Sequence, residues 1–180
     1  MTVTTQRIGP IMFYDSPGQS MFSPDGNKFA LRTSFYTTDI FVFDRCSGTF
    51  SNRQTIYTLN ILNSGQDTLA NAGCAFSPSG RYLYVTNNLF LHQYDTWAPV
   101  INLADSIVGE WDTTFAPLAT TFAFMALAPD DKIYLSTWNG SNQLHVINYP
   151  DSLGQSCGFV QHGLILPSLN ALVFPNATNY

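Results

Sequence analysis

The fold of this chain is decided by a short stretch that occurs three times, first as Phe22-Ser23-Pro24-Asp25-Gly26. The stretch returns as Phe76-Ser77-Pro78-Ser79-Gly80 and, more loosely, as Leu127-Ala128-Pro129-Asp130-Asp131. The prolines at positions 24, 78 and 129 are 54 and 51 residues apart. A repeat of about 50 residues, rich in strands and turns, is typical of a β-propeller blade.

A second marker keeps the same spacing. An apolar run ends in Asp44 in the first unit, in Asp95 in the second and in Asn148 in the third, at intervals of 51 and 53 residues. Within each turn, proline presets one backbone angle, and glycine or aspartate favours a positive φ at another, as a hairpin requires. We therefore predict an all-β chain, a partial β-propeller of about three four-stranded antiparallel blades.

The repeat also sets the expected boundaries. Residues 1–18 are expected to hold an outer strand, near residues 8–14, or the remnant of a preceding blade. The three blades are expected at about 19–60, 71–104 and 122–166, followed by a C-terminal tail at 167–180. Their fourth strands are expected near Gln54–Leu59, Pro99–Leu103 and Gly163–Leu166.

Two connections are longer than the repeat requires, at residues 104–121 and 149–162. Long connections in propellers usually emerge at a face, where ligands are met. Three blades do not close a ring, because known propellers have about 4–8. We expect the ring to be completed by the missing blades of a parent chain or by a second copy.

Composition limits the partners. Charged residues make up 11% of the chain, against about 25% in an average protein. The net charge is −5 and the few cations are scattered, so we expect no nucleic-acid binding. No apolar run is long enough for a transmembrane helix, so no membrane insertion is expected. The N-terminus lacks an apolar signal core, which indicates either an intracellular chain or a start that is not the natural one.

Several strings resemble a known repeat family. Tyr84-Val85-Thr86-Asn87 is the tetrapeptide of the YVTN group, and longer strings lie at 43–48, 74–85 and 158–167. Together they resemble the YVTN/WD40-like β-propeller region of Bacteroidetes secreted or cell-surface proteins, of the type IX secretion and gliding-motility-associated type. The resemblance spans residues 15–180 and implies an extracellular or cell-surface parent. In that family more sequence follows the Asn179-Tyr180 ending, so we expect the C-terminal part of a propeller cut from a larger protein.

No pattern predicts catalysis. Asp25 and Asp130 lie in hairpin turns, and Asp44 and Asp95 are expected to cap the turns that follow them. The histidines, His92, His145 and His162, show no metal-binding spacing, and no cofactor or metal site is predicted. Glu110 and Asp112 are too close in one loop to flank a glycosidic bond.

The tryptophans are the candidates for ligand contact. They lie in or beside predicted connections, and Trp138 is followed by amides that suit a sugar or a peptide. The alternative is that each tryptophan packs between blades. The candidate binding residues are Trp97, Trp111, Trp138, Asn139 and Asn142.

The cysteines allow two interpretations. Cys74 precedes an apolar turn and is expected to be a small core residue. A disulfide between Cys46 and Cys157 would bridge non-neighbouring repeats, and the alternative is that both thiols are free.

We therefore expect a non-catalytic interaction or scaffold module of a secreted or surface bacterial protein, which binds a protein or a glycan at a propeller face. One alternative is a carbohydrate-binding propeller. Another is a lactonase-like hydrolytic enzyme, to which YVTN-type propellers are similar. The residues that could then contribute are Arg32, Arg45, His92 and His145.

Overall fold

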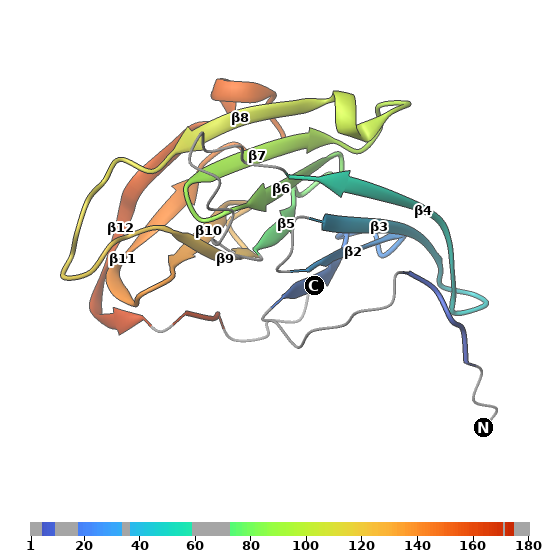
Figure 1. The fold of residues 1–180 in the computed structure, drawn as a ribbon, viewed down its shortest axis with the longest axis horizontal. Helices are drawn as coiled ribbons and strands as arrows, with labels where there is room; N and C mark the ends of the chain where they lie inside the picture. The colour runs from blue at the N-terminus through green and yellow to red at the C-terminus, as the bar shows by residue number, and fades with distance from the viewer. Residues whose placement is uncertain (1–4, 10–17, 34–36, 59–72, 171, 175–180) are drawn as a thin grey trace, which may run out of the picture.

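The computed structural model describes residues 5–9, 18–33, 37–58, 73–170 and 172–174. They form three four-stranded antiparallel sheets that follow one another along the chain, each with its strands in sequence order (Figure 1). This confirms the prediction of an all-β chain with three four-stranded blades. Most of the outer strand predicted near residues 8–14 lies outside the described residues.

The sheets share one layout, in which the first strand of each is innermost. The first sheet contains β1 (Gln19–Phe22), β2 (Lys28–Arg32), β3 (Thr37–Asp44) and β4 (Thr49–Tyr57). The second contains β5 (Cys74–Phe76), β6 (Tyr82–Thr86), β7 (Phe90–Asp95) and β8 (Asp105–Glu110). The third contains β9 (Phe122–Leu127), β10 (Ile133–Thr137), β11 (Ser141–Ile147) and β12 (Phe159–Asn170). Two short 3-10 helices precede outer strands: η1 (Ile101–Leu103) and η2 (Gly154–Cys157).

The predicted fourth strand at Pro99–Leu103 is wrong. Those residues lead into and form η1, and β8 begins at Asp105. The proline lacks a backbone N–H and cannot donate to a strand ladder, so it favours the turn. The second sheet thus reaches Glu110, and β12 carries the third sheet to Asn170, inside the stretch expected to be a tail.

The repeated turns form as predicted. In the first, the backbone N–H of Gly26 donates to the Ser23 carbonyl at 2.8 Å, and the equivalent bond from Gly80 to Ser77 is also 2.8 Å. Gly26, Gly80 and Asp131 have φ values of 69°, 70° and 61°, which explains the glycine or short polar residue at this position.

The caps at the ends of the third strands are confirmed as well. The carboxylate of Asp44 accepts the backbone N–H of Cys46 at 2.8 Å, and that of Asp95 accepts the backbone N–H of Trp97 at 3.0 Å. Each bond closes a turn toward the outer strand.

The core lies between the sheets. Ala30 and Ile40 of the first sheet pack with Phe76, Leu83 and other residues of the second. A second cluster joins the other face of the second sheet to the third, and its aromatic members are Tyr82, Tyr84 and Phe122. Stacking of sheet on sheet around a common axis is how propeller blades bury their faces.

The cysteines do not pair. Cys74 is fully buried in the core between the first two sheets, as predicted. Cys46 is exposed, Cys157 is buried in η2, and both thiols are free. No helix in the described part of the chain is long and apolar enough to cross a membrane.

Gln19 joins the innermost strands of all three sheets. Its amide oxygen accepts the backbone N–H of Cys74 at 3.0 Å and that of Met125 at 3.1 Å. Its amide nitrogen donates to the Met125 carbonyl. One side chain of β1 therefore satisfies the free edges of β5 and β9, which have no strand on their inner side in the described residues.

Three further side-chain amides connect neighbouring sheets in the same two-point way. Each donates to a backbone carbonyl at 2.7 or 2.8 Å and accepts the backbone N–H two residues later at 2.7 to 3.2 Å. They are Asn102 with Thr55 and Tyr57, Gln161 with Glu110 and Asp112, and Gln93 with Ser152 and Gly154.

We predict that Gln19→Ala lowers the free energy of unfolding by about 2 kcal/mol, because it leaves three backbone groups without their partner. Urea unfolding measures the change. Gln54→Ala, on the exposed surface of β4, is the matched control and should change stability by less than about 0.5 kcal/mol. Equal effects of the two substitutions would contradict the role given to Gln19.

Candidate functional site

Three of the five predicted binding residues meet at one place. The connection from β8 to β9, residues 111–121, begins with Trp111 and passes beside the β10–β11 turn, which carries Trp138 and Asn139. Asn142 lies in β11 and is partly buried. The fifth residue, Trp97, lies at the other end of the second sheet, in the turn after β7.

Hydrogen bonds brace the connection internally and join it to the β10–β11 turn. The Trp111 indole N–H donates to the Thr120 hydroxyl at 3.3 Å. The backbone N–H of Trp138 donates to the Thr121 carbonyl at 3.0 Å, and the Asn139 amide donates to the Ala119 carbonyl at 3.1 Å. The connection is therefore fixed at several points, so its surface is preorganised.

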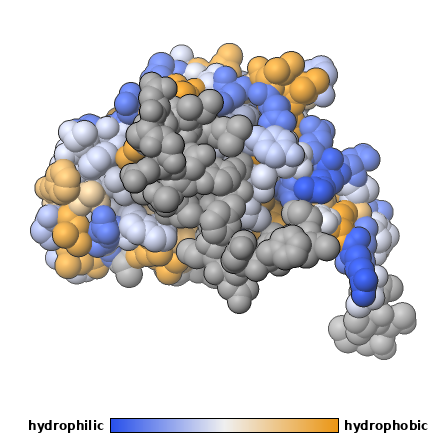
Figure 2. All heavy atoms as spheres, viewed as in Figure 1, coloured by the Kyte–Doolittle hydropathy of each residue, from blue (hydrophilic) through white to orange (hydrophobic). Residues whose placement is uncertain are grey.

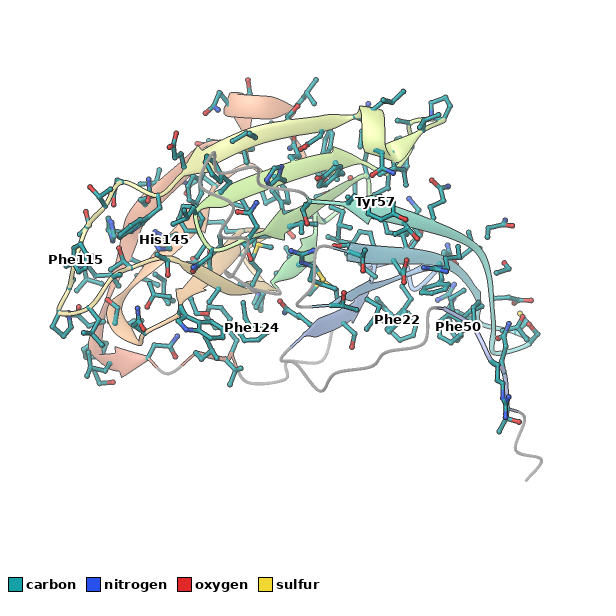
Figure 3. All side chains as sticks on the ribbon, viewed as in Figure 1. Phe22, Phe50, Tyr57, Phe115, Phe124 and His145 are labelled. Atoms are coloured by element: carbon teal, nitrogen blue, oxygen red, sulfur yellow. The ribbon has the colours of Figure 1, made fainter. Side chains whose placement is uncertain are left out.

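The sequence interpretation missed the residues that this connection exposes. Phe115 is 66% exposed and Leu118 is 53% exposed. The rings of Phe115 and Trp111 meet in an edge-to-face contact, with 5.8 Å between their centroids. Figure 3 places Phe115 at the outer end of the molecule, where Figure 2 shows apolar side chains at the left edge. We name Trp111, Phe115, Leu118, Trp138 and Asn139 the connection surface.

Trp97 has a separate environment. It is 63% exposed, and the Arg81 guanidinium lies 5.2 Å from its ring centroid. Arg81 also donates to the Asp95 carboxylate at 2.8 Å, a bond that raises the pKa of Arg81 and lowers the pKa of Asp95. Trp97 therefore neither packs between blades nor joins the connection surface.

One position of the third strand carries a buried ionisable side chain in every sheet. The three residues pair with the same position of the second strand, and each is at most 4% exposed. Asp39 accepts a hydrogen bond from Arg53 at 2.9 Å, and His92 lies 3.0 Å from Asp105. These residues are Asp39 in β3, His92 in β7 and His145 in β11. Because the position recurs in all three blades, we infer that it ties each third strand to its surroundings.

His145 shows how such a tie works. Its Nε2 lies 2.9 Å from the Thr120 carbonyl, and its Nδ1 lies 3.3 Å from the backbone N–H of His162. The first contact requires a ring N–H and the second requires a ring lone pair, so only the neutral imidazole makes both. Burial, followed by the nearby His162, lowers the pKa of His145 to about 4.

His162, which contacts His145, also contacts the connection between β8 and β9. Its Nε2 lies 3.1 Å from the Asp112 carboxylate. Partial burial raises the pKa of Asp112, but hydrogen bonds from Thr114 and the charge of His162 outweigh it and lower that pKa below its ordinary value. The β12 strand and the start of the connection are therefore joined by a charge-assisted contact. Across the described ranges, no three His, Cys, Asp or Glu side chains gather in a way that could hold a metal ion.

The residues considered for a lactonase-like site have different surroundings. Arg32 is buried and donates to the Thr86 carbonyl at 3.3 Å, whereas Arg45 is exposed in the β3–β4 turn. The two histidines are held in separate blades by the partners described above.

Comparisons with known proteins show the fold. No protein-family model matches the sequence, and no curated protein matches it. A solved protein from Lactobacillus plantarum is 18% identical, with a TM-score of 0.54 over 84% of this chain and 42% of that one. A putative 6-phosphogluconolactonase from Bacteroides uniformis is 20% identical, with a TM-score of 0.51 over 83% of this chain and 40% of its own. One from Bacteroides fragilis is 16% identical, with a TM-score of 0.52 over 87% and 42%.

This chain thus spans about two-fifths of the length of the solved structures that it resembles. Three blades that fill this share correspond to a ring of about seven. At these identities the likeness concerns the fold alone, and the chain is a partial β-propeller.

We predict that His145 makes the fold sensitive to acid. The unfolded chain takes up a proton at His145 near pH 6.5, whereas the folded chain resists it to about pH 4. The free energy of unfolding should therefore be fully retained above pH 6.5 and fall by about 3 kcal/mol as pH drops to 4.

His145→Gln tests the pH prediction because glutamine keeps a donor and an acceptor but does not titrate. Urea unfolding at several pH values should show a smaller loss between pH 6.5 and 4 in the variant than in the wild type. An identical loss in both proteins would show that other groups cause the acid sensitivity.

Proposed function

We propose that this chain is a non-catalytic interaction module, whose partner binds at the connection surface. The supporting observation is that a fixed connection presents Phe115 and Leu118 to solvent. Aromatic side chains held in place are common anchors of interfaces, because little conformational entropy remains to be lost on binding. We favour a protein partner, since both of these side chains are apolar.

A glycan is the second candidate. Trp138 is partly exposed, and the exposed amide of Asn139 lies next to it. An aromatic ring beside an amide suits a sugar, which offers C–H groups to the ring and hydroxyl groups to the amide.

The setting of the module is also a proposal. The resemblance to YVTN/WD40-like propellers of Bacteroidetes favours a secreted or cell-surface parent of the type IX secretion type. The low charge of the chain supports this, since its polarity comes from Ser, Thr, Asn and Gln.

We predict that a photo-crosslinking residue at position 115 captures a partner from the envelope or secreted fraction of a Bacteroidetes bacterium. The same residue at position 153, where Leu153 is 61% exposed and distant in sequence, is the matched control. For the captured partner, Phe115→Ala should weaken binding at least about tenfold. The melting temperature of the Phe115→Ala variant should stay close to that of the wild type, because the Phe115 side chain is mostly exposed.

Periodate treatment of the fractions separates the two candidates, since it destroys glycans and spares most protein surfaces. Equal capture through positions 115 and 153 would contradict the proposed surface.

Two of the similar structures are named putative 6-phosphogluconolactonases, so sugar lactones are the substrates to try. Their turnover by this chain would contradict a non-catalytic module.

A further inference from the structure

We propose that the connection surface binds a peptide segment in which a lysine or arginine lies beside apolar side chains, and that Glu110 selects this cation. The proposal rests on the proposed function, because it assigns the chemistry of the partner at the same surface.

Two acidic residues border the aromatic centre of the connection surface. Glu110, the only glutamate of the chain, ends β8 and directly precedes Trp111, and Asp112 directly follows Trp111. Both acidic residues are exposed. Since the Trp111 ring contacts Phe115, a ligand seated on these rings lies close to negative charge.

The two carboxylates differ in their availability. That of Asp112 accepts the backbone N–H of Thr114 at 3.0 Å and lies 3.1 Å from Nε2 of His162. Glu110 is held by its backbone, because the Gln161 amide donates to its carbonyl at 2.8 Å. In the described part of the chain, the Glu110 carboxylate has no ion-pair partner. It is therefore available to a cation from outside.

The lysines and arginines of the second and third sheets lie elsewhere. Residues 73–170 contain two, Arg81 and Lys132. Each comes just before the second strand of its sheet, next to a repeated turn, whereas the connection lies at the opposite ends of the strands. Arg81 is also paired with Asp95. No lysine or arginine of these sheets thus offsets the charge of Glu110, and a basic partner complements it.

The apolar part of the surface continues onto β12. The end of β12 borders the β10–β11 turn, since a Cβ at Gly140 would lie 3.1 Å from the Asn170 carbonyl. Leu169, next to Asn170, is 67% exposed. The connection, which exposes Phe115, bonds the same turn through Asn139. Figure 1 shows the connection and the end of β12 at the same end of the molecule.

Apolar and acidic groups together favour a basic peptide over a neutral glycan. Lysine and arginine carry an apolar stem below the charge, so one such residue can pack on an aromatic ring and reach a carboxylate. A neutral glycan offers no cation to Glu110. The occupant that fits is therefore a peptide with apolar anchors and a basic residue beside them.

The experiment selects short random peptides, displayed on phage, on the immobilised chain after removal of those that bind the Phe115→Ala variant. We expect the selected peptides to be enriched in Lys or Arg next to aromatic or aliphatic residues. For a synthetic copy of a selected peptide, Glu110→Gln should weaken binding about threefold. Added salt should weaken binding to the wild type more than binding to Glu110→Gln.

Asp131→Asn is the matched control, because it removes one negative charge at the opposite ends of the strands from an exposed residue. Asparagine also tolerates the positive φ of 61° at this position. The control should leave peptide binding unchanged. Both variants should keep the melting temperature of the wild type, since both side chains are exposed.

The outcomes separate this proposal from the proposed function. Peptides that need Phe115 but lack basic residues, or that bind Glu110→Gln as well as the wild type, would overturn the role of Glu110 and leave the connection surface standing. Equal weakening by Glu110→Gln and Asp131→Asn would overturn it too, because net charge alone would then explain the effect. A selection that yields no Phe115-dependent peptide would contradict the connection surface itself.

Discussion

The structure depends on satisfying the free edges of its strands. Each blade has an innermost and an outermost strand with a row of backbone groups that no neighbouring strand of the same sheet pairs. In this chain, side-chain amides take that place, because an amide offers the same donor and acceptor as a peptide group. Gln19 does so at the centre, and Asn102 and Gln161 do so at the outer edges of β4 and β8. Gln6 binds both backbone groups of Phe50 on β4 in the same manner.

This role explains the composition. In most β proteins, charged side chains protect the exposed strand edges. The surface of this protein is unusual because it is poor in Lys and Glu and rich in neutral polar residues. Here the neutral amides do that work and connect the sheets at the same time. Gln93 illustrates the second effect, since it lies in the middle of the second sheet and binds two backbone groups of the loop before β12.

Much of the fold could be predicted from the repeat, because the turn at Pro24 and the cap at Asp44 are local signals with fixed geometry. The outer strand of the second sheet could not be predicted in this way. No repeated turn or cap marks the start of β8, and the chain before it forms η1. For the candidate site, Trp111 and Asn139 could be singled out as residue types in connections. Their meeting depends on hydrogen bonds between segments distant in sequence. Phe115 gave no signal, because an apolar residue in a loop looks the same whether the fold buries or exposes it.

The repeat also separates structural residues from candidates for function. Asp39, His92 and His145 differ in type, but they occupy one register position and each binds a neighbouring element. A role shared by all three blades is a property of the blade, so a buried histidine here is weak support for a reactive site. The connection surface is different in kind, because Phe115 and Leu118 lie outside the strands and outside the repeated turns and caps. A feature that departs from the repeat while its surroundings keep to it is where a function specific to this chain is best sought.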